Sequence, residues 1–111
     1  MEISSSSRPN VSILHLTGKF DIEQAAAFES VFNEALAQKP ANIGLDMSAV
    51  TYIDSSAIGS IIKSLNLIKN IGGNIVLFGL KPMIINVFKL ARLDNFFTII
   101  STEEFDSRFP G

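Results

Sequence analysis

The chain has 111 residues, of which 47% are hydrophobic and 18% are charged, with a formal net charge of -2 and no cysteine. This composition supports one folded domain, residues 1–111, and excludes a disordered chain, because disordered segments are poor in apolar residues. The lack of cysteine excludes disulfides and cysteine-ligated metal sites. The nearly balanced charge argues against direct nucleic acid binding, which usually needs clustered lysine and arginine.

The N-terminus and the apolar runs give no sign of export or membrane insertion. Met1–Ser7 lacks the basic and then apolar order of a signal peptide. The apolar runs, such as Ile75–Leu80, are far shorter than the roughly 20 residues of a membrane-spanning helix. We therefore expect a cytoplasmic protein, and the absence of cysteine suits that reducing compartment.

The N-terminal residues predict a pair of strands. Val11–Thr17 is rich in β-branched and apolar residues, and we expect this strand to end at Gly18. Residues 2–7 predict a possible edge strand that would pair with it as a hairpin, although serine is a weak strand former.

A helix and a further strand are predicted next. From Ala25 to Leu36, apolar residues recur at three- and four-residue steps, which indicates an amphipathic helix. Asp21 is placed to act as its N-cap. Alternating apolar residues over residues 41–47 predict a strand, and we expect a loop over Ser48–Ile53.

The sequence from Ser55 or Ser56 to Ile71 predicts the second helix. Its inward stripe consists of Ile58, Ile61, Leu65 and Ile68. Gly72 and Gly73 then end the pattern as a helix C-cap does.

The C-terminal part continues the alternation of strands and helices. The expected order is a buried strand at residues 74–80, a helix from Pro82 to about Ala91, a strand at residues 96–100 and a short helix after Ser101. Such alternation implies an α/β fold with right-handed crossovers. We therefore predict a mostly parallel central sheet of four to five strands with about four helices.

Asp54, Ser55 and Ser56 lie where an extended apolar stretch becomes a helix. The first turn of a helix leaves several backbone N–H groups without partners. Asp54 or Ser55 can accept hydrogen bonds from them as an N-cap, and this structural role is sufficient to explain either residue.

Ser56 differs because the helical period places it on the outward face, together with Ser60, Lys63, Leu67 and Asn70. A phosphate on Ser56 would carry about -1.5 to -2 charges at a helix N-terminus, where the dipole and the free N–H groups favour anions. Leu67 would give the same face an exposed apolar contact for a partner protein. Phosphorylation would then oppose docking.

Two segments resemble the sulphate transporter and anti-sigma factor antagonist (STAS) domain family, and the resemblance extends over nearly the whole chain. Leu16–Asp21 is similar to the family's early Leu-x-Gly-x-x-Asp motif, and Leu45–Gly59, with the sequence LDMSAVTYIDSSAIG, resembles its more specific signature. Free-standing members of this length resemble bacterial anti-sigma factor antagonists, which bind a serine-kinase anti-sigma factor and so release a sigma factor.

The resemblance implies that Ser56 is a phospho-acceptor, modified by that kinase with ATP and reset by a metal-dependent serine phosphatase. The residues expected to support this site or to bind the partner are Asp21, Asp54, Ser55, Ala57, Gly59, Ser60, Lys63 and Leu67. Many members carry glycine at the position of Ala57, and alanine is also small enough for close approach. None of these residues is expected to be catalytic, and no cofactor or metal is implied.

Two other functions compete with this interpretation. An enzyme would need a nucleophile with a base, but the only histidine, His15, lies in a predicted strand, and there is no Gly-x-Ser-x-Gly motif. We interpret His15 as a packed or edge-exposed strand residue. The second alternative is a constitutive STAS scaffold subunit of a transport or sensory complex, which would not require phosphorylation.

Overall fold

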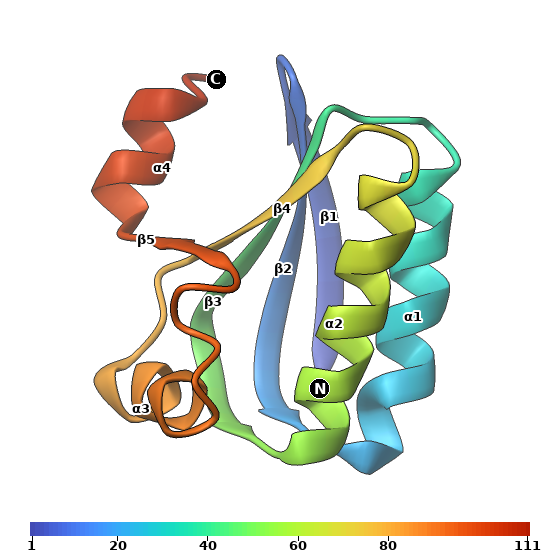
Figure 1. The fold of residues 1–111 in the computed structure, drawn as a ribbon. Helices are drawn as coiled ribbons and strands as arrows, with labels where there is room; N and C mark the ends of the chain where they lie inside the picture. The colour runs from blue at the N-terminus through green and yellow to red at the C-terminus, as the bar shows by residue number, and fades with distance from the viewer.

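A five-stranded sheet forms the centre of the computed structural model, which describes residues 1–111 (Figure 1). In chain order the elements are β1 (Glu2–Arg8), β2 (Val11–Phe20), α1 (Ile22–Leu36), β3 (Asn42–Ile53), α2 (Ser55–Lys69), β4 (Asn74–Phe78), α3 (Pro82–Leu90), β5 (Thr98–Ile100) and α4 (Thr102–Arg108). The strands lie in sequence order, with β1 antiparallel to β2 and all later neighbours parallel. The predicted α/β class, the N-terminal hairpin and the number of helices are confirmed.

Four predicted strand ends are wrong. β4 ends at Phe78 and not at residue 80, and β5 begins at Thr98 and not at residue 96. The other two errors concern the pairing of β2 with β3. Strand β2 continues through Gly18, which has a φ of 98°, and the predicted loop Ser48–Ile53 is the second half of β3. The pairing shifts register twice, and β3 carries one extra residue at each shift. Such bulges bend a strand and disturb its alternating pattern, so the sequence of this segment does not read as a strand.

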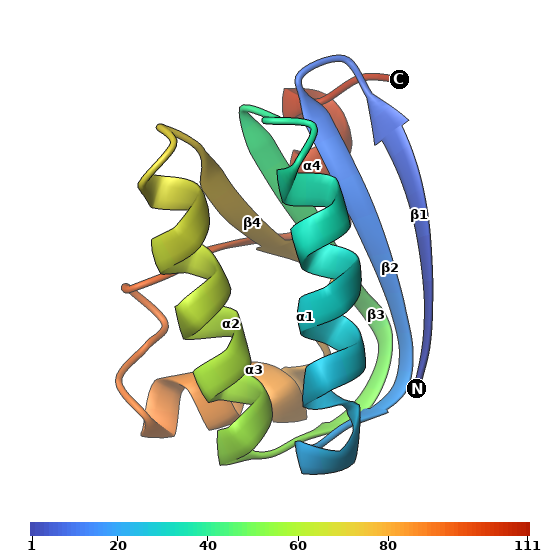
Figure 2. The same cartoon turned by 90° about the vertical axis from the view of Figure 1, so that its right-hand side faces the viewer.

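Helices α1 and α2 lie side by side on one face of the sheet and run in the same direction (Figure 2). They cover a core cluster of 20 buried residues, to which α3 also contributes. The predicted inward stripe of α2 is buried in this cluster, as are Phe28 and Phe32 of α1. Helix α2 ends as predicted, since the N–H of Gly73 donates to the carbonyl of Ile68 and Gly72 has a φ of 82°.

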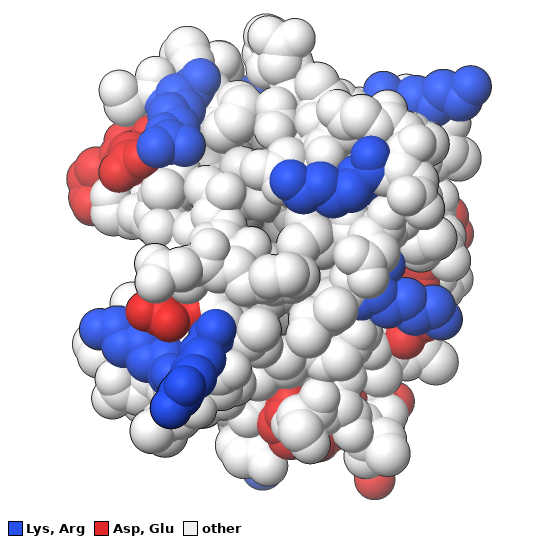
Figure 3. Space-filling view, in the orientation of Figure 1, with Lys and Arg blue, Asp and Glu red and all other residues white.

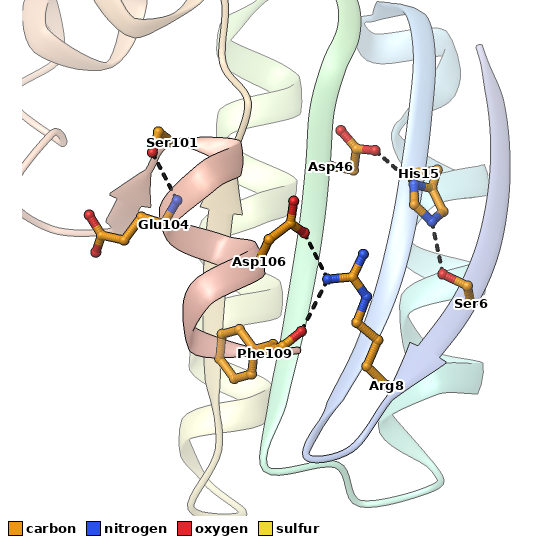
Figure 4. A network of polar contacts seen from close by, with 8 residues as sticks. All are labelled: Ser6, Arg8, His15, Asp46, Ser101, Glu104, Asp106 and Phe109. Atoms are coloured by element: carbon orange, nitrogen blue, oxygen red, sulfur yellow. Dashed lines mark hydrogen bonds and ion pairs between the residues drawn. The ribbon is translucent and has the colours of Figure 1, made fainter. Parts of the chain in front are cut away.

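The opposite face of the sheet is covered in part by α4 (Figure 1). Its core is a separate cluster of five buried residues, in which Phe105 stacks on Phe78 with 3.8 Å between ring centroids. Gly44 makes this possible, because a Cβ there would lie 2.9 Å from the Phe105 ring. Arg8 ties α4 to the hairpin, with bonds of 2.8 Å to Asp106 and 3.1 Å to the carbonyl of Phe109 (Figure 4).

Candidate functional site

The N-termini of α1 and α2 meet at the carboxylate of Asp54. Asp54 is the N-cap of α2, where its Oδ1 accepts a hydrogen bond of 3.0 Å from the N–H of Ala57. Its Oδ2 accepts a bond of 3.3 Å from the N–H of Ile22, the first residue of α1. The Asp54 side chain therefore accepts hydrogen bonds from backbone N–H groups at the N-termini of both helices and links these two ends. Both N-termini lie at the lower end of Figure 2.

Asp21 caps α1 as predicted. Its Oδ1 accepts a hydrogen bond of 3.1 Å from the N–H of Glu23, and its backbone carbonyl accepts one of 3.0 Å from the N–H of Gln24. Because Asp54 binds the residue that follows Asp21, the structure brings these two predicted site residues to the same end of the helix pair.

Ser55 and Ser56 are the first two residues of α2, and neither hydroxyl is engaged in a hydrogen bond within the chain. Ser55 is exposed and Ser56 is partly exposed. The first helical bond of α2 runs from the N–H of Ile58 to the carbonyl of Asp54, so the N–H groups of both serines precede the helical ladder. The cap is thus Asp54 and not Ser55, and two backbone donors remain free beside the Ser56 hydroxyl.

Two of the residues expected to support the site or to bind the partner are buried. Ala57 lies in the main core with no exposed surface, and Ser60 is only 6% exposed. The hydroxyl of Ser60 donates to Glu29 of α1 at 2.8 Å. The predicted position of Ser60 on the outward face is wrong because α1 packs along that flank of α2, a long-range contact that the period of α2 alone does not reveal.

Glu29 also binds Lys63, whose Nζ lies 2.8 Å from Oε1 of the carboxylate. Hydrogen bonds from Lys63 and Ser60 hold the pKa of Glu29 below its ordinary value, although desolvation acts in the opposite direction. The three side chains form a polar clasp between α1 and α2, and they fix the helix that carries Ser56.

Leu67 lies on the exposed surface of α2, as predicted, and Gly59 is exposed as well. A Cβ built on Gly59 would meet nothing within 4 Å, so no contact within the chain requires glycine there. Leu67 is 37% exposed and lies 11 residues beyond Ser56, a separation of about 16 Å along a helix. Gly59 is therefore much closer to Ser56 than Leu67 is.

Two exposed apolar side chains near Asp54 were not predicted. Ile22 is 70% exposed and Tyr52 is 48% exposed. Ile22 could have been found in the sequence, because it follows the N-cap Asp21 and precedes the apolar pattern that runs from Ala25 to Leu36. Tyr52 was hidden by the wrong assignment of its segment as a loop.

The match to a known family covers almost the entire chain, since residues 2–105 match the STAS domain. The chain belongs to the STAS domain family. The resemblance of Leu16–Asp21 and Leu45–Gly59 to that family is thereby confirmed. In this STAS domain, the second motif forms most of β3 and the first turn of α2, and it therefore contains Asp54 and both serines.

Solved structures described as anti-sigma factor antagonists share this STAS fold. A candidate antagonist from Thermotoga maritima has a TM-score of 0.87 at 28% identity, over 98% of this chain and 95% of that one. An antagonist from Mycobacterium paratuberculosis has a TM-score of 0.86 at 18% identity, over 99% and 94% of the two chains. Unphosphorylated SpoIIAA, a Bacillus protein also solved in a phosphorylated form, has a TM-score of 0.72 at 17% identity, over 96% and 94%.

The surface of this STAS domain around Ser56 is not a ligand pocket. One groove lies between the edge strand β1 and α1, and a second lies between α3 and α4, where the surface in Figure 3 is hollowed; neither is lined by Ser56 or Asp54. On the face in Figure 3, basic side chains are scattered, and several have acidic neighbours. None of the helices has the length and apolar character needed to cross a bilayer.

Proposed function

We propose that this protein is an anti-sigma factor antagonist that is switched by phosphorylation of Ser56. Its unphosphorylated form binds a serine-kinase anti-sigma factor, which then releases a sigma factor, so the protein regulates transcription by partner switching. The observation that carries this proposal is the placement of Ser56, a free and partly exposed hydroxyl at the start of α2, beside backbone donors without helical partners.

The surroundings of Ser56 suit a protein partner. Ile22, whose N–H binds Asp54, and Tyr52, two residues before Asp54, are exposed apolar side chains of the kind that protein-binding surfaces use. Gly59 lies one turn beyond Ser56 and faces open space, although a glycine inside a helix costs about 1 kcal/mol relative to alanine. A partner that approaches the α2 backbone closely would account for this glycine.

A phosphate on Ser56 would leave the fold stable but would weaken binding of the partner. The free N–H groups and the helix dipole stabilise an anion at this position. The same phosphate would place about -1.5 to -2 charges on the proposed interface, two residues from the carboxylate of Asp54. A docked partner would have to desolvate that charge, so phosphorylation weakens binding.

The Ser56 hydroxyl has no neighbouring base that could activate it for self-phosphorylation. Both oxygens of Asp54, the adjacent carboxylate, are engaged with backbone donors, and the Ser56 hydroxyl has no base as a hydrogen-bond partner. The kinase partner therefore provides ATP and the catalytic base, and a separate serine phosphatase resets the switch. This protein needs no cofactor of its own for that role.

The test is phosphorylation by the cognate kinase with ATP, followed by intact-protein and peptide mass spectrometry. We expect one phosphate on Ser56, none on Ser56→Ala, and unchanged modification of the matched control Ser55→Ala. In a pull-down, Ser56→Ala should bind the anti-sigma factor as wild type does, and Ser56→Asp should bind more weakly. An active kinase that leaves Ser56 unmodified would overturn the switch, and binding without any modification would favour a constitutive scaffold.

A further inference from the structure

Unlike Ser56, Ser6 has its hydroxyl hydrogen-bonded to an imidazole, on the part of the sheet face that α4 does not cover. The Oγ of Ser6 on β1 lies 2.9 Å from Nε2 of His15 on β2 (Figure 4). The Nδ1 of the same ring lies 2.7 Å from Oδ2 of Asp46 on β3. A serine, a histidine and an aspartate on three neighbouring strands are therefore connected by hydrogen bonds. The sequence predicted that His15 lies in a strand but did not identify these two partners.

The partners of the imidazole determine its tautomer. The Asp46 carboxylate can only accept hydrogen bonds, so Nδ1 carries the proton and, in the neutral ring, Nε2 accepts from the Ser6 hydroxyl. This is the arrangement in which a histidine removes a proton from a serine while an aspartate orients the ring.

Asp46 is itself held firmly. Its other oxygen, Oδ1, accepts bonds from the backbone N–H of Ser48 at 3.1 Å and from the Ser48 hydroxyl at 2.7 Å. Partial burial acts to raise the pKa of Asp46, but the bonds from His15 and Ser48 outweigh it and keep the pKa below its ordinary value. The carboxylate therefore stays ionised at neutral pH and continues to accept the hydrogen bond from Nδ1.

Ser6 and the imidazole of His15 are both in contact with solvent. Ser6 is exposed, and the His15 side chain keeps 38% of its surface in contact with solvent. Arg8, the nearest cation on β1, donates hydrogen bonds to Asp106 and to the carbonyl of Phe109. It is therefore not free to bind the phosphate of a phosphoryl donor at Ser6. An uncharged acyl donor does not need such a cation.

We propose that Ser6 is a nucleophilic site for acyl groups, with His15 as its base and Asp46 as the residue that positions the ring. The donor class is an activated ester or thioester. Ser6 Oγ forms a bond to the acyl carbon, the bond from that carbon to the leaving oxygen or sulfur breaks, and the serine proton moves to Nε2 of His15. The proton then passes from Nε2 to the leaving group. In a later step His15 removes a proton from water, the water oxygen bonds to the acyl carbon, and the proton returns to Ser6 Oγ as the acyl group leaves.

The probe is 4-nitrophenyl acetate, with acetylation of each serine measured by tandem mass spectrometry so that the reactive terminal amine and lysines are counted separately. Ser4 is the internal control, because it faces the same side of β1, pairs directly with His15 in the strand register and has no hydrogen bond to the ring. We expect Ser6 to be acetylated at least about tenfold faster than Ser4, since a general base typically contributes about 10²–10⁴-fold.

Variants then separate this chemistry from a structural contact. His15→Gln should lower acetylation of Ser6 to the rate of Ser4, Asp46→Asn should lower it without changing the rate at Ser4, and Ser6→Ala should abolish the fast site. Far-UV circular dichroism confirms that each variant is folded. The proposal is overturned if Ser6 reacts no faster than Ser4, or if folded His15→Gln retains the fast reaction at Ser6.

Discussion

The two faces of the sheet are held by cores of very different size. The face under α1, α2 and α3 buries 20 residues in one cluster and carries Ser56, whereas the face partly covered by α4 buries five and carries Ser6. The two serines also differ in their surroundings. Ser56 lies beside free backbone donors that suit an anion, and Ser6 lies beside a base. The comparison suggests two functional surfaces that can be altered separately.

The largest effect is expected from Gly44→Ala, which tests whether the two faces are independent. The added methyl group would lie 2.9 Å from the Phe105 ring and would displace it from Phe78. We expect a loss of about 1–3 kcal/mol in the free energy of unfolding, measured with urea. Affinity for the anti-sigma factor should be unchanged in calorimetry, and a large loss of affinity would show that the faces are coupled.

Asp54→Ala tests the junction of the two helices on the larger face. It removes the acceptor of both the Ala57 and the Ile22 N–H groups, so we expect a loss of about 1–2 kcal/mol in unfolding free energy. The matched control is Ser55→Ala, which removes an exposed hydroxyl without a partner and should change that free energy by less than about 0.5 kcal/mol. Equal effects of the two variants in urea unfolding would contradict the role given to Asp54.

Gly59→Ala should separate stability from binding. Because a side chain there meets open space, the variant should gain about 1 kcal/mol in unfolding free energy. The same methyl group should obstruct the partner and lower its affinity by about tenfold, which corresponds to about 1.4 kcal/mol. Tighter or unchanged binding in calorimetry would remove Gly59 from the proposed interface.

The smallest effect is expected at the clasp between α1 and α2. Since the pKa of Glu29 is lower in the folded protein than its ordinary value of 4.5, its ionised form stabilises the fold at neutral pH, and this contribution is lost as the pH falls below about 4.5. Wild type should therefore exceed Glu29→Gln in unfolding free energy at pH 7, and the difference should shrink toward pH 3. A difference that grows on acidification would contradict the clasp.

Local features of the fold and site could be predicted from the sequence. Asp21 and the Asp54–Ser56 segment were placed correctly at helix starts because a cap depends on residues within one turn. The inward stripe of α2 followed from its period, and the family signature identified Ser56 as the phospho-acceptor to be tested.

Features that depend on distant residues could not be predicted in this way. The burial of Ser60 requires α1 beside α2, and the bond from His15 to Asp46 requires the register of two strands whose residues are 31 positions apart. The extent of β3 was hidden by its two bulges, and with it the exposed side chain of Tyr52.

The central claim is that phosphate on Ser56 controls partner binding, and the most direct measurement is the affinity of one partner for two forms of the same protein. Calorimetry should compare the unphosphorylated protein with the protein phosphorylated only on Ser56, each titrated with the anti-sigma factor without ATP. We predict tight binding of the unphosphorylated form and an affinity lower by about 100-fold or more for the phosphorylated form, a difference of about 2.7 kcal/mol. Equal affinities of the two forms would contradict the account.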